Sequence, residues 1–206
     1  MTTFPKEGTK TKYLTVRRIA RIAILSAIAF LLMFFEFPLP FAPSFYKIDF
    51  SETAVLIGGF ALGPAAAVWI EALKIVLNLL FQGTTTAFVG EFANFVIGCS
   101  LAVPASIIYR HHKTKKTAFI GMLVGTLCMT IVGTLLNAVL LLPMYSRLYG
   151  MPMSALIAMG TAIIPAIKDV WTFVLFSVAP FNLLKGVIVS AITAVLYKHI
   201  SPILHR

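Results

Sequence analysis

Polar side chains interrupt three apolar segments of this sequence. Glu91 and Asn94 lie in GTTTAFVGEFANF, Asn137 lies in a long apolar run, and Asn182 and Lys185 lie in PFNLLKG. A carboxylate at the centre of a bilayer helix costs roughly 2.5–3.5 kcal/mol on insertion scales, so such groups usually face a partner or a cavity. Carboxylate, amide and ammonium groups together donate and accept hydrogen bonds. These five side chains are therefore candidates for recognising a polar ligand.

The composition places the chain in a membrane. Of its 206 residues, 59% are hydrophobic and 12% are charged, and the mean hydropathy is +0.94. Soluble domains contain about 45–50% apolar and about 25% charged residues. The 17 Lys and Arg residues outnumber 7 acidic residues, but they cluster between apolar runs, which is a pattern of membrane topology. We expect a multi-pass protein in contact with membrane lipid and no nucleic-acid partner.

The elements that must position the polar groups are transmembrane helices, since about 20 apolar residues cross the hydrocarbon core of a bilayer. The sequence predicts an all-α membrane protein with six of them. The expected spans are residues 16–35, a short span that ends at Gly63, and then 64–81, 86–109, 117–142 and 181–200. We expect residues 1–206 to form one membrane-embedded domain, with residues 1–15 as a cytoplasmic tail.

Two segments do not fit regular spans. Residues 37–50 contain three prolines and five aromatic residues, and proline breaks a helix by removing a donor and clashing with the preceding turn. We therefore expect a structured outer loop there. Residues 143–181 contain short apolar stretches divided by Pro165, Lys168 and Asp169. Each stretch is too short to cross alone, so we expect outer-face or re-entrant helices.

The distribution of basic residues predicts that both termini are cytoplasmic. With the amino end inside, the cytoplasmic segments carry Lys6, Lys10, Lys12, Arg17, Arg18, Arg21, Arg110, Lys113, Lys115, Lys116, Lys198 and Arg206. Lys47, Arg147 and Lys168 are then outside. This asymmetry fits the positive-inside rule, whereas a seven-span alternative would export the basic carboxyl end.

The polar residues converge at one depth when they are placed by the rise of about 1.5 Å per helical residue. Glu91 with Asn94, and Asn182 with Lys185, are pairs spaced i, i+3, so each pair shares a helix face. Together with Asn137, all five fall in the outer leaflet. The outer loop adds Phe45 and Tyr46, and the GTTT turn adds Thr85. The sequence predicts a pocket that is open to the outside; the alternative is that Glu91 and Lys185 simply pair and hold helices together.

Two further polar pairs have a structural interpretation. Glu71 and Lys74 are spaced i, i+3 in the third span, and we expect a mutual ion pair there, with a role in coupling as the alternative. Asp49 and Glu52 precede an apolar run at the spacing of a capping pair. We expect this second pair to cap a helix, with ligand contact as the alternative.

The motifs of several enzyme classes are absent from the sequence. It contains no GxxxxGK[ST] loop, no HExxH and no CxxC, and no Ser, His and Asp set falls on suitable elements. ATP hydrolysis and metal catalysis therefore lack their residues. We expect no enzyme activity, no metal site and no cofactor.

Small residues at i, i+4 mark two surfaces for close helix packing. Ala23 and Ala27 form such a face in the first span, and Gly121 and Gly125 form another in the fifth. Small side chains let a second helix approach closely. Each face is a candidate for contact with a partner.

The motifs FEFPLPFAPSFYKIDFSE, GTTTAFVGEFANF and PFNLLKG, on six spans with AxxxA in the first, resemble the riboflavin-specific S component of the energy-coupling factor (ECF) vitamin transporters. The resemblance covers nearly the whole chain. It implies the S-component fold and a subunit of the bacterial cell membrane that captures riboflavin from outside for ATP-driven uptake. It implies as partners a transmembrane coupling protein, the T component, which Ala23 and Ala27 would meet, and two cytoplasmic ATPases.

The resemblance also implies site residues, since Glu91, Asn137, Asn182 and Lys185 match the flavin ligands of the family. Riboflavin would be the transported substrate rather than a cofactor, and binding of FMN stays open. Three alternatives stay open too. They are an S component for another vitamin, a self-sufficient secondary carrier, for which the sequence offers no inverted repeat, and an assembly subunit without ligand.

Overall fold

The computed structural model describes residues 15–43 and 45–204, and the side chains up to Tyr197. The expected tail at residues 1–15 lies outside the described residues except for Thr15. The elements are α1 (Val16–Met33), β1 (Phe37–Pro38), β2 (Lys47–Ile48), α2 (Ser51–Leu62), α3 (Pro64–Gln82), α4 (Val89–His111), α5 (Lys115–Leu136), the π-helix η1 (Asn137–Leu141), α6 (Leu142–Leu148), α7 (Met153–Thr161), α8 (Val170–Phe173), the π-helix η2 (Val174–Val178) and α9 (Ala179–Leu204).

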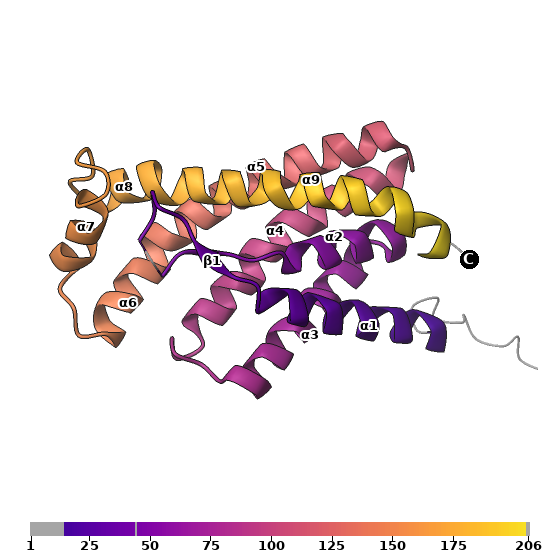
Figure 1. Ribbon diagram of the computed structural model, residues 1–206, viewed down its shortest axis with the longest axis horizontal. Helices are drawn as coiled ribbons and strands as arrows, with labels where there is room; N and C mark the ends of the chain where they lie inside the picture. Colours follow the sequence, from indigo (N-terminus) through magenta and orange to yellow (C-terminus); the bar gives the residue numbers. More distant parts are fainter. Residues whose placement is uncertain (1–14, 44, 205–206) are drawn as a thin grey trace, which may run out of the picture.

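The helices form an elongated bundle. Figure 1 shows α6, α7 and α8 at one end, while α1 begins and α9 ends at the opposite end. Among the described residues, four helical segments are long and apolar enough to cross a membrane: Pro64–Gln82, Val89–His111, Lys115–Leu148 and Val170–Tyr197. The α2 helix has 12 residues and is therefore only about 18 Å long. The all-α membrane architecture is confirmed at this level.

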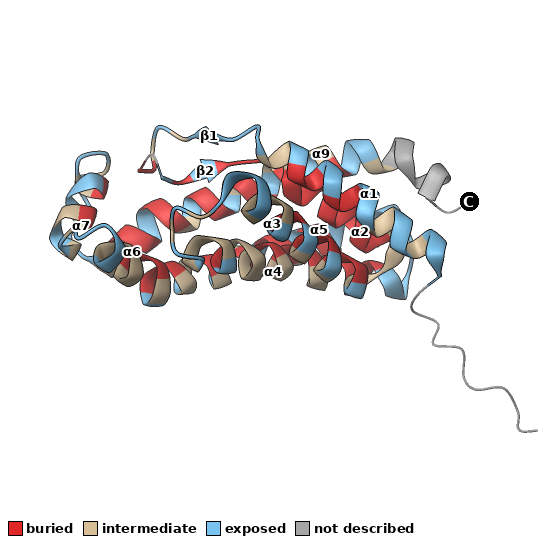
Figure 2. Ribbon diagram, turned by 90° about the horizontal axis from the view of Figure 1, so that it is seen from below, coloured by how far each residue is buried: buried red, intermediate tan, exposed pale blue. Residues whose placement is uncertain are grey.

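The segment 37–50 is a structured loop, as the sequence predicts. Its strands β1 and β2 pair antiparallel, with Phe37 opposite Ile48 and Pro38 opposite Lys47. Figure 2 shows this loop crossing the side of the bundle, with exposed residues along β1 and buried residues near β2. Tyr46 and Ile48 are buried and pack in one apolar cluster with Phe173 and Phe181. The loop is therefore anchored through its second half.

The prediction of separate outer-face or re-entrant helices over 143–181 is wrong for both ends of that segment. Residues up to Leu148 continue the helix of α5 through η1 and α6, and Val170 begins a helical run that continues through η2 into α9. Only α7, with 9 residues, is a separate short helix. Apart from α7, the apolar stretches are short because they are the ends of two long helical segments.

Asp169 is the reason that the last helix begins where it does. Its side chain accepts a hydrogen bond of 2.8 Å from the backbone N–H of Thr172, and the Thr172 hydroxyl accepts one of 2.9 Å from the Asp169 backbone N–H. This is a capping box, which satisfies helix donors that would otherwise have no partner. The hydrogen bond from the Thr172 backbone holds the pKa of Asp169 below its usual value. The charge lies at a helix boundary and not within the apolar run.

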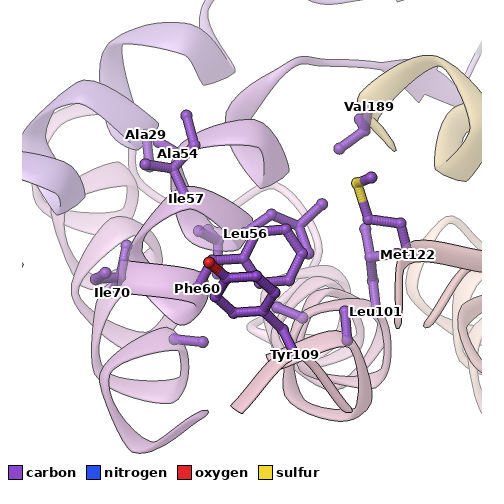
Figure 3. Packing of buried hydrophobic residues seen from close by; sticks show 14 of the residues in the cluster. Ala29, Ala54, Leu56, Ile57, Phe60, Ile70, Leu101, Tyr109, Met122 and Val189 are labelled. Atoms are coloured by element: carbon purple, nitrogen blue, oxygen red, sulfur yellow. The ribbon is translucent and has the colours of Figure 1, made fainter. Parts of the chain in front are cut away.

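A close-packed apolar core lies in the half of the bundle where α4 ends and α5 begins. Figure 3 shows Leu56, Phe60, Leu101 and Tyr109 packed together, with Met122 and Val189 approaching from other helices. Such packing joins α2, α4, α5 and α9 into one unit.

The Gly121 and Gly125 face lies inside this chain and packs against α4. A Cβ atom added at Gly125 would lie 2.3 Å from the Leu101 carbonyl oxygen, and one at Gly121 would lie 2.7 Å from the Ala105 carbonyl oxygen. Any larger side chain would force the helices apart. The alternative of a partner interface on this face is therefore wrong, whereas Ala23 and Ala27 are exposed.

A buried ion network joins α2 and α3. The Lys74 ammonium lies 2.7 Å from Glu71 Oε1 and 2.9 Å from Glu52 Oε1, and all three side chains are at most 1% exposed. The predicted Glu71–Lys74 pair is confirmed, and Glu52 joins it. The capping prediction holds only for Asp49, whose Oδ1 accepts a hydrogen bond of 2.8 Å from the backbone N–H of Ser51, the first residue of α2. It is wrong for Glu52, which pairs with Lys74 instead.

Substitution of Lys74 by Met removes the only cation between two buried carboxylates, and we expect the free energy of unfolding to fall by about 3–5 kcal/mol. Thermal unfolding in detergent measures the effect. Lys47→Met is the matched control, since it breaks an exposed pair with Glu36 and should cost at most about 1 kcal/mol. Equal losses in the two variants would contradict a structural role for the network.

A candidate ligand-binding cavity

A cavity of about 370 Å³ lies at the end of the bundle near the β1–β2 loop. All eight residues predicted from the sequence to bind a ligand line it: Phe45, Tyr46, Thr85, Glu91, Asn94, Asn137, Asn182 and Lys185. They come from the outer loop, the turn before α4, and the helices α4, η1 and α9. Ligand cavities in proteins enclose roughly 300–1,000 Å³, so the volume suits a small organic molecule.

Asp49 forms an ion pair with Lys185 in the wall of the cavity. Lys185 Nζ lies 2.9 Å from Asp49 Oδ2, and both side chains are less than a tenth exposed. Burial favours the neutral form of Asp49, but the charges of Lys185 and Lys74 outweigh it, so the pKa of Asp49 lies well below its usual value. The alternative in which Lys185 pairs with Glu91 is wrong. An ammonium group has three donors, so Lys185 keeps donors for a ligand.

Tyr46 and Asn137 are connected across the cavity. The Tyr46 hydroxyl donates to Asn137 Oδ1 at 2.6 Å, and Asn137 Nδ2 donates to the Gly133 carbonyl at 2.7 Å. Burial, with a smaller contribution from Tyr145, raises the pKa of Tyr46 well above its usual value, so the hydroxyl keeps its proton. The Tyr46 ring lies 4.6 Å from that of Phe45. The loop therefore places an aromatic surface over polar groups.

Glu91 lies nearer the helix end than the sequence predicts. The expected span began at residue 86 and placed Glu91 two turns inside, but α4 begins at Val89. A carboxylate in the first turn of a helix is stabilised by the helix dipole. Glu91 Oε2 also accepts a hydrogen bond of 2.7 Å from the Thr86 hydroxyl.

The turn before α4 has an unusual backbone. Ala87 and Phe88 have φ of 48° and 68°, in the left-handed region that non-glycine residues rarely adopt. Strained backbone of this kind concentrates at ligand sites. Here the turn carries Thr85 and leads into the first turn of α4, which carries Glu91, and both residues line the cavity.

Asn182 lies beside a glycine of the neighbouring helix. A Cβ at Gly133 would come within 2.8 Å of Asn182 Nδ2, so glycine lets α9 approach α5 at this level. Asn182 Nδ2 donates to the Val178 carbonyl at 3.0 Å. The π-helices η1 and η2 touch each other near here, and π segments in long helices frequently mark functional sites.

Several lining residues are not predicted from the sequence: Glu36, Lys47, Asn78, Gln82 and Tyr145. Asp49 also lines the cavity, in agreement with the alternative of ligand contact given for it. Asn78 and Gln82 continue the polar face that Glu71 and Lys74 begin on α3, at helical spacings of three and four. This polar stripe on α3 is visible in the sequence and could have predicted that α3 lines the cavity. Glu36 and Lys47 form an ion pair at the ends of the loop, which no local spacing reveals.

The cavity has more polar than apolar lining residues. Met33, Ile97, Leu141 and Phe181 supply apolar surface beside the donors and acceptors. Among the described residues, no group of three or more His, Cys, Asp or Glu side chains could hold a metal ion. This arrangement suits a flat, partly apolar molecule with hydrogen-bonding edges.

Comparison with known proteins identifies the family. The family described as "ECF transporter, substrate-specific component" matches residues 17–197. The "Riboflavin transporter RibU" of Staphylococcus aureus is 35% identical over 92% of this chain and 93% of its own length. The "Riboflavin transporter FmnP" of Bacillus subtilis is 32% identical over 91% of this chain and 93% of its own.

A solved structure agrees with this assignment. It is described as "Structure and mechanism of the S component of a bacterial ECF transporter", shares 34% identity, and superposes with a TM-score of 0.71 over 92% of this chain and 98% of that chain. With a family match over most of its length, the chain belongs to the substrate-specific components of the ECF transporters.

Proposed function

We propose that this chain captures riboflavin in the outer cavity and delivers it to an ECF transporter of the bacterial cell membrane for ATP-driven uptake. The observation that carries the proposal is the convergence of Glu91, Asn137, Asn182 and Lys185 on one cavity beneath an aromatic loop. Relatives at 35% and 32% identity are named riboflavin transporters. In this proposal the chain binds and carries a substrate and has no enzyme activity.

The chemistry of riboflavin matches the groups that line the cavity. Its tricyclic ring is flat and apolar at the dimethyl edge, while the pyrimidine edge carries carbonyl acceptors and an N–H donor. We assign Lys185 and Asn182 as donors to the ring acceptors, and Glu91 and Asn137 as partners of the N–H or the ribityl hydroxyls. Phe45 and Tyr46 would cover the ring. Asn94 and Thr85 complete the wall on the side of α4.

The proposed membrane orientation has six spans, with residues 1–206 as one domain and both termini cytoplasmic. The α1 helix has 18 residues with arginines near its start, and the short α2 would complete its crossing through the loop that precedes it. The start of α1 and the end of α9 lie at the same end of the bundle (Figure 1), as an even number of crossings requires. The cavity would then open to the outside.

The proposed partners are the transmembrane T component and two cytoplasmic ATPases. Ala23 and Ala27 are exposed on α1, and the neighbouring Ile24 and Ile28 are 59% and 43% exposed. A stripe of small residues flanked by apolar side chains suits close approach of another membrane helix. We propose this face as the contact with the T component.

Variants of the cavity test the binding proposal. We expect Glu91→Gln and the double variant Asp49→Asn/Lys185→Met to lose about 1.5–3 kcal/mol of riboflavin binding, the contribution of a hydrogen bond to a charged group. This is roughly a 10- to 150-fold rise in Kd. Quenching of flavin fluorescence by the purified chain measures it, with FMN titrated in parallel.

The double variant removes both members of the ion pair, so that no unpaired buried charge remains. Lys168→Met, an exposed cation outside the cavity, is the matched control and should bind as the parent does. Unchanged flavin affinity in both cavity variants would rule out this site.

Cysteine labelling tests the orientation. After replacement of Cys99 and Cys128 by Ala, we expect Tyr149→Cys to react with an impermeant maleimide in intact cells, since residue 149 would face outside. Lys113→Cys should react only after permeabilisation. The reverse pattern would overturn the proposed topology.

Larger side chains on α1 test the proposed contact with the T component. We expect Ala23→Leu/Ala27→Leu to abolish co-purification of the T component and riboflavin uptake while flavin binding stays unchanged, because leucine keeps the helices apart. Val187→Leu, on an exposed position of α9, is the control and should assemble normally. Normal assembly of the α1 variant would place the partner elsewhere.

A further inference from the structure

Two adjoining cavities lie at the end of the bundle opposite the candidate flavin site. One, of about 320 Å³, lies around the turn between α2 and α3, and the other, of about 450 Å³, lies between the ends of α4 and α9 and the start of α5. Phe60 and Lys113 line both of them. The two spaces therefore adjoin each other and have different linings.

The first of these, the basic cavity, is positively charged. Arg18, Arg110 and Lys113 line it together with residues 59–65. Arg18 is held in place because its Nη2 donates to the Leu62 carbonyl at 2.8 Å. Arg110 and Lys113 are exposed.

No acidic side chain among the described residues neutralises these cations. Each of the six described acids is occupied elsewhere: Glu36, Asp49 and Glu91 line the outer cavity, Glu52 and Glu71 pair with Lys74, and Asp169 caps α8. Like charges gathered without a counter-charge create a positive potential that attracts anions. The basic cavity is therefore complementary to an anionic group.

The second space, the aromatic cavity, has a mostly apolar lining. Phe60, Tyr109 and Tyr197 stack around it, with ring centroids 4.8 Å apart for Phe60 and Tyr109 and 5.6 Å apart for Phe60 and Tyr197. The two tyrosine hydroxyls are 2.8 Å apart and satisfy each other. Figure 3 shows Phe60 and Tyr109 side by side, with Met122 nearby. The charged residues that line this space, Lys113 and Lys115, lie at the turn between α4 and α5 and at the start of α5.

The aromatic cavity also borders the surface that faces lipid. Phe119 lines it and is 66% exposed, and Ile120 and Leu123 on the same helix are exposed as well. An occupant of both cavities would thus have an anionic head beside the basic residues and an apolar chain beside hydrocarbon. That is the chemistry of an anionic phospholipid.

We propose that this end of the bundle binds an anionic phospholipid, with its phosphate at Arg18, Arg110 and Lys113 and an acyl chain along the aromatic cavity. The proposal rests on the orientation given above, which places this end in the inner leaflet. Basic pockets between membrane helices on that side attract anionic headgroups. The bound lipid would join α1 to the α2–α3 and α4–α5 turns.

The test uses the full chain, purified and delipidated in detergent, with phosphatidylglycerol, phosphatidylcholine or inorganic phosphate added. A ligand of the folded state raises the Tm. We expect phosphatidylglycerol to raise the Tm of the parent, and phosphatidylcholine and phosphate to leave it nearly unchanged. In Arg110→Gln/Lys113→Gln we expect the rise to fall by more than half.

The matched control is Arg147→Gln/Lys168→Gln, which removes the same charge at the other end of the bundle and should keep the full rise. Equal rises in the parent and in Arg110→Gln/Lys113→Gln would overturn the proposal. So would an equal effect of phosphatidylcholine, which has no net charge, of phosphate, which indicates a soluble anion, or no effect of any of the three. Riboflavin titration of the same samples reports the outer cavity separately, so failure of one proposal is distinct from failure of the other.

Discussion

The structure depends on a set of buried ion pairs, in which each charge that lies away from water has a partner of opposite charge. Lys74 lies between Glu52 and Glu71 in the interior of the bundle, and its ammonium also donates to the Ser51 hydroxyl at 3.2 Å. That hydroxyl donates in turn to Asp49, which pairs with Lys185. A buried charge without its partner is strongly unfavourable, so α2, α3, α9 and the outer loop must keep their relative positions. The apolar core alone would allow helices to slide, whereas this chain of ions permits one arrangement.

The same chain of ions reaches the candidate flavin site. Asp49 and Lys185 form part of the cavity wall, while Glu71 and Lys74 lie deep in the bundle. The cavity therefore has one rigid side, set by ion pairs, and one side covered by the loop that carries Tyr46. Preorganised polar groups bind a ligand with less loss of conformational freedom.

The sequence predicted which polar residues share a cavity better than it predicted the helix boundaries. Glu91, Asn137, Asn182 and Lys185 were recognisable because polar groups in lipid need a reason, and the cavity brings them together. Asp49 was assigned to a cap because its three-residue spacing from Glu52 fits one, while its partner Lys185 is 136 residues away. No local pattern reveals such a contact. The predicted helix boundaries in 143–181 are wrong because each short apolar stretch was considered by itself. Asp169 in fact starts a helical run that continues to Leu204.

The two π-helices bear on how cavities of this kind diversify. Each π segment accommodates one more residue than the α-helix it interrupts, and a shift of one residue turns the following helix by about 100° because an α-helix has 3.6 residues per turn. Deleting one residue within η1 would rotate Tyr145 and the rest of α6 away from the cavity while α5 keeps its contacts with α4. Insertions and deletions within the π-helices would therefore change the shape of the candidate ligand-binding cavity without changing the apolar core. A gap of one position in an alignment of such transporters would then indicate that the shape of the bound substrate differs, which substitutions alone do not reveal.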